Sequence, residues 1–368
     1  MPKLYDTQDK PKKAFLVSII NGGKSDEPKA LELEGLCKTL GIEIAAHEKI
    51  RVREKTAKFG MGSGKAEELA NKAKDAQADL IVFDFNPSPS QQRNWEEISG
   101  IPVLDRQEII IKIFEDRAST REAELQVKLA ELVYLLPRLT HKYIDLSRQR
   151  GGRYGTKGAG ETKLETDRRK IEKRINQLEK EIDKVGKQRQ MQRRQRQRSN
   201  VPVCAIVGYT NSGKSSLLNA LTGADVLAED KLFATLDAVT RRFQLTPEKS
   251  VLLTDTVGFI RDLPHSLIKA FRSTLEEAAL ADILIHILDA CEPDIESNFQ
   301  TTLSVLKELG AKEIPIITVL NKIDKIDAQA AEELQNRFPE SIAVSVKNGF
   351  GLDNLKKKIE EFYNRESS

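Results

Sequence analysis

Cysteine, histidine and tryptophan are scarce in this sequence. Its 368 residues include 3 Cys, 4 His and 1 Trp. The cysteines Cys37, Cys204 and Cys291 lie far apart and form no C-x-x-C pair, so neither a disulfide framework nor a zinc site is supported. The histidines do not cluster, which removes the basis for a histidine metal site or a general base. This pattern favours a reducing compartment.

Long apolar runs are absent as well. No stretch approaches ~18 uninterrupted apolar residues, so we expect no membrane span. Met1 to Lys13 is polar and lacks the apolar centre of a signal peptide, so we expect no export and predict a cytoplasmic protein. Hydrophobic residues make up 39% and charged residues 31%, which is enough for buried cores under an ionised surface. The length predicts two or three folding units.

The net charge of +3 conceals one strongly basic segment. Between Arg148 and Arg198 there are 18 Lys and Arg against 7 Asp and Glu, so this segment carries +11 and the rest of the chain −8. A basic element in an otherwise acidic chain is typical of contact with a polyanion, most often nucleic acid. A solvated charged helix is the alternative.

Residues 14–118 alternate short apolar runs with helical patterns. The runs Ala14–Ile20, Ile42–Glu48, Asp79–Phe85 and Ile101–Leu104 are typical of strands. Helices are expected near residues 28–40, 64–77, 88–99 and 105–118. This alternation predicts βαβ units and a small parallel α/β domain over residues 1–120.

A short glycine–lysine motif, Gly62-Ser63-Gly64-Lys65, precedes the second expected helix. It resembles a fragment of a phosphate loop but lacks the preceding strand and the full spacing. We interpret it as a turn and a helix start, and a second nucleotide or RNA phosphate contact is the alternative. Trp95 lies in an amphipathic helical pattern and is expected in the core.

Residues 121–198 carry two apolar seams with helical spacing. One runs from Leu125 to Leu146 and the other from Ile171 to Val185, each stepping by four and three residues. Pro137 should kink or interrupt the first helix. The five glycines within residues 151–160 cannot hold a helix. We predict a long antiparallel helical hairpin with a glycine-rich basic loop, followed by a basic linker over 184–198 that is either a helix end or flexible.

The apolar strand Val201–Val207 leads directly into a phosphate loop. Residues 208–215 fit G-x-x-x-x-G-K-[ST] between a strand and a helix, as the motif requires. Lys214 should pair with the β- and γ-phosphate oxygens, and Ser215 should offer its hydroxyl to Mg²⁺. The residues expected to bind the nucleotide here are Gly208, Tyr209, Thr210, Asn211, Ser212, Gly213, Lys214, Ser215 and Ser216.

A second strand, Val251–Thr254, ends in Asp255-Thr256-Val257-Gly258. An aspartate at this place can hold the outer shell of the Mg²⁺, and Gly258 can give its N–H to the γ-phosphate. All four residues are therefore predicted to belong to the nucleotide site.

A third strand, Ile316–Leu320, ends in Asn321-Lys322-Ile323-Asp324. Asp324 would accept hydrogen bonds from N1–H and the 2-amino group of guanine, and adenine has neither donor. Lys322 would support the base plane or the phosphate loop, and Ser345-Val346-Lys347 forms a last loop near the base. In this order the motifs predict a GTP-binding domain over residues 199–368.

These motifs resemble those of the translation-factor-like class of P-loop GTPases, and the whole chain resembles the HflX family of ribosome-associated GTPases. The most specific stretches are Gly160-Glu161-Thr162-Lys163-Leu164-Glu165-Thr166-Asp167-Arg168-Arg169 and Phe233-Ala234-Thr235-Leu236-Asp237-Ala238-Val239-Thr240-Arg241. The resemblance implies a Ras-like C-terminal domain, GTP hydrolysis, and binding to the large ribosomal subunit in rescue or splitting of stalled ribosomes. It also implies that residues 233–241 are switch I, with Phe233 at the nucleotide and Thr235 closing onto Mg²⁺ and the γ-phosphate.

The position after the Asp-x-x-Gly turn holds Phe259, where Ras-like proteins have a water-orienting glutamine. We therefore expect Lys214, Thr235 and Gly258 to act in catalysis but to give slow hydrolysis without a partner or an ion. Asn211 resembles the asparagine of potassium-activated GTPases and is a candidate K⁺ ligand. A hydrogen bond within its own loop is the alternative.

Basic side chains around the glycine-rich loop are expected to neutralise ribosomal RNA phosphates. They are Arg148, Arg150, Arg153, Lys157, Arg168 and Arg169. Two other functions stay open: a GTPase of RNA metabolism that acts on free RNA, and an interaction protein whose assembly is timed by GTP. Two seams of matching length joined by one loop favour pairing within the chain, so we expect a monomer.

Overall fold

The computed structural model describes residues 12–20, 26–142, 159–197, 201–226 and 229–366. Contacts divide the chain into two compact units, one of Met1–Ile113 with Ala130–Gln177 and one of Phe114–Leu129 with Leu178–Ser368. Each unit contains its own sheet. None of the helices in the described part of the chain is long and apolar enough to cross a membrane.

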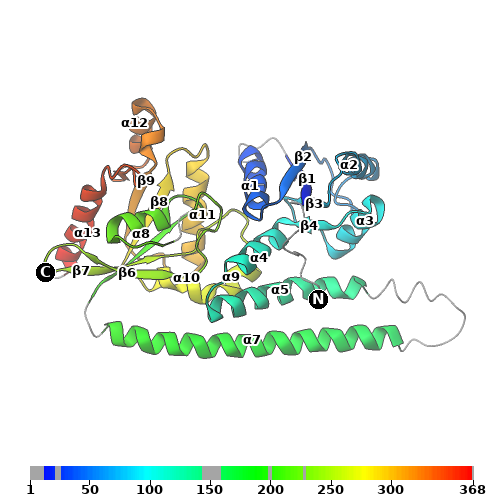
Figure 1. The fold of residues 1–368 in the computed structure, drawn as a ribbon, viewed down its shortest axis with the longest axis horizontal. Coiled ribbons are helices and arrows are strands. Elements are labelled where there is room, and N and C mark those ends of the chain that lie inside the picture. The colour runs from blue at the N-terminus through cyan, green and yellow to red at the C-terminus, as the bar shows by residue number, and fades with distance from the viewer. Residues whose placement is uncertain (1–11, 21–25, 143–158, 198–200, 227–228, 367–368) are drawn as a thin grey trace, which may run out of the picture. The chain divides into compact units, whose positions relative to one another are not determined.

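The N-terminal part of the chain alternates strands and helices as the sequence predicts. Its strands pair in parallel in the order β2-β1-β3-β4 among the described residues. The predicted parallel α/β fold is therefore confirmed (Figure 1). The elements are β1 (Lys13–Ile19), α1 (Asp26–Thr39), β2 (Glu43–Ile50), α2 (Ser63–Asp75), β3 (Leu80–Phe83), α3 (Pro89–Ser99), β4 (Val103–Asp105) and α4 (Arg106–Arg117).

Helices cover this sheet because its strands are apolar on both faces. All four residues of β3 are buried. Helices α2 and α3 pack against one face, where Leu69 and Trp95 join the core. Trp95 is fully buried and donates its ring N–H to the carbonyl of Phe59 at 3.0 Å, which confirms its expected place in the core.

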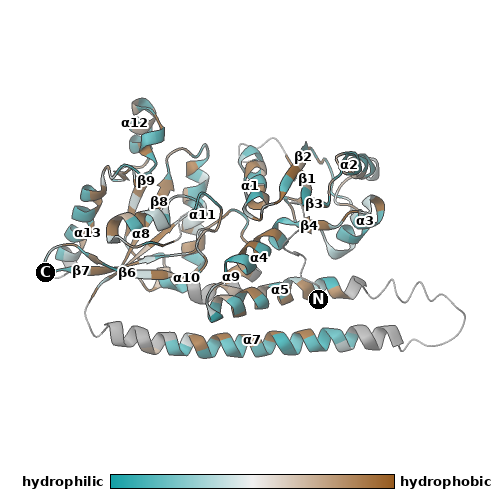
Figure 2. Ribbon diagram, in the orientation of Figure 1, coloured by the Kyte–Doolittle hydropathy of each residue, from teal (hydrophilic) through white to brown (hydrophobic). Residues whose placement is uncertain are grey.

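The two helices of the predicted hairpin are α5 (Arg121–Lys142) and α7 (Ala159–Gln197). The start of α5 lies beside the later part of α7, where Arg121 and Glu181 form an ion pair at 3.5 Å. This pairing confirms an antiparallel hairpin. Leu178 of α7 is fully buried in the same unit, while most of α7 is hydrophilic (Figure 2).

Helix α5 continues through Pro137 to Lys142, so the proline does not interrupt it. The proline costs one backbone hydrogen bond, which the packing of the apolar seam, with Leu129 and Tyr134 buried, outweighs. Helix α7 continues to Gln197, so most of the basic segment after the second seam is a helix end and not a flexible linker. Tyr143 and Leu146, the end of the first seam, lie outside the described residues.

The C-terminal part of the chain forms the second sheet, in the order β10-β9-β8-β5-β7-β6 over the described residues. Strand β6 is antiparallel to β7, and the other pairs are parallel. The elements are β5 (Val203–Gly208), α8 (Lys214–Thr222), β6 (Val239–Gln244), β7 (Ser250–Asp255), α9 (His265–Ala270), α10 (Arg272–Ala279), β8 (Ile283–Asp289), α11 (Ile295–Glu308), β9 (Ile316–Asn321), η1 (Ile323–Lys325), α12 (Ala328–Arg337), β10 (Ile342–Ala343) and α13 (Leu352–Glu366).

Strand β8 lies at the centre of this sheet and is buried from Ile283 to Leu288. His286 in this strand is fully buried and stacks on Phe299, with ring centroids 5.1 Å apart. Neither ring nitrogen has a hydrogen-bond partner among the described residues.

Candidate functional site

The phosphate loop joins β5 to α8 at the carboxyl edge of the second sheet, where ligands bind in open α/β folds. Gly208 has φ +151° and Gly213 has φ +98°. A Cβ at Gly208 would collide with the carbonyl of Ile287, and one at Gly213 with the amide of Asn321. Only glycine fits both positions, so the motif has a steric cause here as well as a chemical one.

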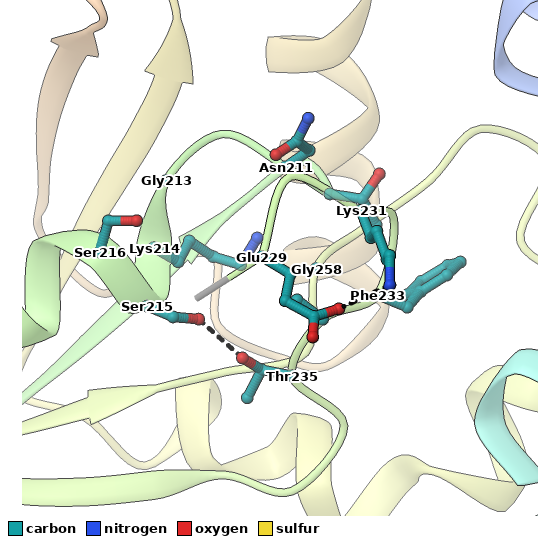
Figure 3. A pocket seen from close by; sticks show the side chains of 12 residues that line it. Asn211, Gly213, Lys214, Ser215, Ser216, Glu229, Lys231, Phe233, Thr235 and Gly258 are labelled. Carbon is teal, nitrogen blue, oxygen red and sulfur yellow. Dashed lines mark hydrogen bonds and ion pairs between the residues drawn. The ribbon is translucent and has the colours of Figure 1, made fainter. Parts of the chain in front are cut away.

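Lys214 is the first residue of α8 and is buried. Its ammonium donates to the carbonyl of Tyr209 at 2.6 Å, so the side chain bends back over the loop (Figure 3). Burial lowers the pKa of Lys214 to about 8, and the nearby Asp255 carboxylate opposes that shift. A phosphate placed beside this ammonium would favour its charged form.

Three oxygen-bearing side chains from separate segments meet next to Lys214. The Ser215 hydroxyl lies 2.6 Å from the Thr235 hydroxyl (Figure 3). It donates to Asp255 Oδ2 at 2.6 Å. Asp255 Oδ1 is buried with no hydrogen-bond partner among the described residues, and burial raises the pKa of this carboxyl. Hydroxyl and carboxylate oxygens are the ligands that Mg²⁺ prefers, so these residues fit the ion.

Gly258 lies against the phosphate loop. A Cβ built on it would come within 2.8 Å of both Lys214 Nζ and Thr210 Cα. Phe259 is buried, and its backbone pairs with the loop: its N–H donates to Gly208 O at 3.0 Å and its carbonyl accepts from Thr210 N–H at 2.8 Å. The phenyl ring therefore belongs to the core and offers no polar group to a water molecule.

The residues predicted to read the base contact the phosphate loop or one another. Asn321 donates to the Ser212 carbonyl at 2.9 Å, and Lys322 donates to the Asn211 carbonyl at 2.9 Å and pairs with Asp289 at 2.6 Å. The Ser345 hydroxyl donates to Asp324 Oδ1 at 2.6 Å, and this bond lowers the pKa of Asp324.

The last loop is tied to the same set of residues. Its Val346 N–H donates to Asn321 Oδ1 at 3.2 Å, while Lys347 is exposed. The fold therefore brings the segments 321–324 and 345–347 together beside the phosphate loop.

Two expected nucleotide-binding residues are engaged elsewhere. Thr256 donates its hydroxyl to the Ile206 carbonyl of β5 at 2.7 Å, and Val257 is buried in the core. Their side chains hold the Asp255–Gly258 turn in place. Ser216 and Phe233, by contrast, line the pocket with the residues already described.

The side-chain amide of Asn211 bonds outside its own loop, which differs from the expected alternative to a K⁺ ligand. Its N–H donates to Asp230 at 2.6 Å, in the segment just before the predicted switch I. This contact uses the amide nitrogen and not the amide oxygen.

Several residues of the site were missed by sequence reasoning. Glu229, Lys231 and Ala234 line the pocket, and Glu229 and Lys231 form an ion pair at 3.2 Å (Figure 3). Buried Arg261 donates its N–H to the Tyr209 hydroxyl at 2.8 Å and its guanidinium to Asn298 at 2.7 Å. The run of charged residues at 229–231 could have indicated Glu229 and Lys231. No sequence pattern indicates Arg261.

The predicted RNA-binding residues are divided between described and undescribed parts of the chain. Arg148, Arg150, Arg153 and Lys157 lie outside the described residues. Arg168 and Arg169 are exposed on α7 and pair with Glu172 and Glu165 along the same helix, at 2.9 and 2.8 Å. Exposed pairs of this kind are weak, so both guanidinium groups remain able to meet a phosphate.

A phosphate loop, an Asp-x-x-Gly turn and an Asn-Lys-x-Asp loop at one sheet edge define a P-loop GTPase, and such enzymes generally use Mg²⁺. The family description "50S ribosome-binding GTPase" matches residues 203–322. "GTP-binding GTPase Middle Region" matches residues 117–196 and "GTP-binding GTPase N-terminal" matches residues 27–115.

Characterised relatives span almost the full chain. GTPase HflX of Treponema denticola is 46% identical over 383 residues, covering 97% of this chain and 98% of the relative. That of Akkermansia muciniphila is 45% identical over 96% of this chain and 85% of the relative, and that of Escherichia coli 39% over 97% and 84%. The chain belongs to the HflX family, and it is a GTP-hydrolysing enzyme with a ribosome-binding GTPase domain.

A solved structure has a similar fold. The crystal structure of SsGBP in complex with GDP is 26% identical, covers 97% of this chain and 100% of its own, and gives a TM-score of 0.51.

Proposed function

We propose that this GTPase binds the large ribosomal subunit in its GTP form and acts in rescue or splitting of stalled ribosomes, in the cytoplasm and as a monomer. The observation that carries this proposal is that one chain joins the three GTPase motifs at one sheet edge to a long hairpin in its most basic segment. A nucleotide switch needs two states that differ in affinity by a few kcal/mol. The family match to 50S ribosome-binding GTPases supports the large subunit as the partner.

Within the site, Lys214 would hold the β- and γ-phosphate oxygens and Gly258 would give its N–H to the γ-phosphate. A Cβ built on Gly258 would lie 2.8 Å from Lys214 Nζ, so the two residues line the same space, which supports a shared phosphate contact. Ser215 and Thr235 would hold Mg²⁺, with Asp255 in its outer shell. When bound, the ion supplies charge stabilisation for the transferring phosphoryl group.

Asp324 would read guanine through N1–H and the 2-amino group. Inosine triphosphate lacks the 2-amino donor, so we expect its affinity to fall about 10-fold relative to GTP. In the variant Asp324→Asn this preference should disappear. Equal affinity of the unmodified chain for GTP and ATP would contradict the assignment of the base.

Hydrolysis by the chain alone is expected to be slow, because the buried Phe259 ring cannot orient water. K⁺ held by the Asn211 oxygen is one candidate source of the missing charge. Turnover measured in KCl and in NaCl tests this: faster turnover in KCl supports a K⁺ site, and equal rates would exclude it.

Sedimentation through a sucrose gradient with purified large ribosomal subunits tests the proposed function. We expect co-migration with a non-hydrolysable GTP analogue and not with GDP. Lys214→Ala should lose this co-migration, while Lys65→Ala serves as a matched control on an exposed helix.

The other outcomes identify the alternatives. Equal co-migration with GDP would contradict a GTP-controlled switch. Equally tight binding to RNA of any sequence would favour action on free RNA, and a concentration-dependent dimer without RNA would favour an interaction protein.

A further inference from the structure

Switch I is anchored by a segment that lies far outside the GTPase motifs in the sequence. Residues 114–120, the end of α4 and the turn before α5, contact the loop at residues 229–237. Both segments belong to the second compact unit. The contacts occur at three positions of the loop: Glu229, Phe233 and Asp237.

The contact at Asp237 is the densest. Its carboxylate accepts from the backbone N–H groups of Ser119 and Thr120, each at 3.2 Å. It also accepts from the Ser119 hydroxyl at 2.7 Å and from the Thr120 hydroxyl. Four donors therefore converge on one side chain only two residues from Thr235.

These donors stand at the N-terminus of a long helix. The Thr120 hydroxyl also accepts from Ala123 N–H at 3.2 Å, and its carbonyl accepts from Glu124 N–H at 3.0 Å, so Thr120 caps α5. Free N–H groups and the helix dipole favour a carboxylate at this end. An acidic side chain at position 237 is thus matched to the start of α5.

The two other contacts hold the same loop. Arg117 pairs with Glu229 at 2.9 Å. The Phe114 ring meets Phe233 edge-on at a centroid distance of 4.8 Å, and it meets Phe271 at 4.7 Å. Phe233 is buried with φ +55°, a backbone conformation that a bulky residue adopts only when its surroundings impose it.

We propose that Asp237 is a positioning residue for GTP hydrolysis. The N-terminus of α5 holds its carboxylate and thereby sets Thr235 against Ser215, where the two hydroxyls lie 2.6 Å apart (Figure 3). The segment 114–120 is then part of the catalytic unit, although the GTPase family match covers only residues 203–322. A displacement of the N-terminus of α5 would therefore also displace Thr235. This inference rests on the proposed role of Thr235.

The test is the variant Asp237→Asn in the full chain, which keeps the size of the side chain but loses the carboxylate. We expect kcat for GTP to fall about 10-fold and the Mg²⁺ concentration for half-maximal turnover to rise, because Thr235 is no longer held. Affinity for GDP should stay within about twofold, since the contact acts on the γ-phosphate side. Asp225→Asn, in an exposed residue before the same loop, is the matched control and should behave as the unmodified chain.

A double-mutant cycle separates positioning from simple destabilisation. Ser119→Ala removes one donor to Asp237 and leaves the Thr120 cap of α5 in place. We expect about a threefold loss in kcat from Ser119→Ala, and no additional loss when it is combined with Asp237→Asn.

Three results would overturn the inference: unchanged kcat and Mg²⁺ dependence in Asp237→Asn, additive effects in the cycle, or a fall in GDP affinity and melting temperature as large as the fall in kcat. Thr235→Ala is measured in parallel. If that variant hydrolyses GTP normally, the role of Thr235 fails; if it is defective while Asp237→Asn is normal, only the positioning by Asp237 fails.

Discussion

Two glycine–lysine motifs in this chain stand at the start of a helix, yet only one of them forms a phosphate loop. In Gly62–Lys65 neither glycine has a positive φ, and a Cβ on either would meet no atom within 4 Å. Lys65 is exposed and pairs with Glu68 on its own helix at 2.8 Å. In Gly208–Ser215 both glycines are sterically required, and Lys214 is buried against the loop.

The difference lies in what precedes each turn. Gly208 is the last residue of β5 and pairs with Ile287 of the neighbouring strand β8, so the chain turns sharply at the sheet edge. Residues 51–62 form no strand, so the turn at Gly62 begins a helix and nothing more. A phosphate loop is therefore a packing arrangement of a whole sheet edge, and the lysine is only one of its parts.

The largest expected difference between the two motifs is the effect of a glycine substitution on the affinity for GDP. Gly213→Ala should weaken GDP affinity by about 100-fold, because a Cβ there collides with Asn321 and the residue has φ +98°. Gly64→Ala should leave GDP affinity unchanged and stabilise α2 by up to about 1 kcal/mol. Titration with a fluorescent GDP analogue and thermal melting measure both. Similar losses of affinity in the two variants would refute the comparison.

A smaller effect is expected at the lysines. Lys214→Ala removes charge-assisted hydrogen bonds to phosphate, which should lower kcat/KM for GTP by about 10–100-fold. Lys65→Ala should leave kcat/KM unchanged, because its exposed ion pair contributes little. Steady-state hydrolysis assays distinguish them. A loss of turnover in Lys65→Ala would instead support the alternative that residues 62–65 contact a second nucleotide or an RNA phosphate.

The smallest effect concerns half-buried His47 and fully buried His286, which lie in different units. His47 hydrogen-bonds to Ser18 and to Glu34, each at 2.9 Å. The ring nitrogens of His286 have no hydrogen-bond partner among the described residues, and burial lowers the pKa of His286 to about 3. His286→Leu should therefore stabilise the protein by about 1 kcal/mol, whereas His47→Leu should destabilise it by about 1–3 kcal/mol. Urea unfolding at pH 7.5 measures both changes.

The same histidine predicts a pH dependence. Between about pH 6.5 and 3 the unfolded chain binds a proton at His286 that the folded protein does not. Stability from this group is thus fully present above pH 6.5 and falls by on the order of 1 kcal/mol per pH unit below it. His286→Leu should flatten this part of the curve between pH 6.5 and 5. An unchanged slope would show that other groups cause the acid sensitivity.

Much of the fold and of the nucleotide site follows from contiguous patterns. Alternating apolar runs predict the parallel sheet of the N-terminal part, and each nucleotide motif sits where its own strand ends, as at Gly208, Asp255 and Asn321. Such motifs are readable because a few adjacent residues and their backbone form each part of the site. Thr235 came from family resemblance, since spacing alone does not separate it from neighbouring threonines.

What could not be predicted depends on contacts between distant segments. Asp237 is separated from Ser119 by 118 residues, and Glu229 from Arg117 by 112. No periodicity encodes such pairs. The lack of hydrogen bonds to the His286 ring among the described residues could not be predicted either, because an apolar strand pattern indicates burial and not hydrogen bonding.

We propose that this site binds and positions the phosphates and that a partner completes it, since buried Phe259 cannot orient water. Single-turnover GTP hydrolysis by the full chain, with and without purified large ribosomal subunits, tests this most directly. We expect the rate to rise at least about 10-fold with subunits. An equal rate with and without them, at subunit concentrations where binding is saturated, would contradict it.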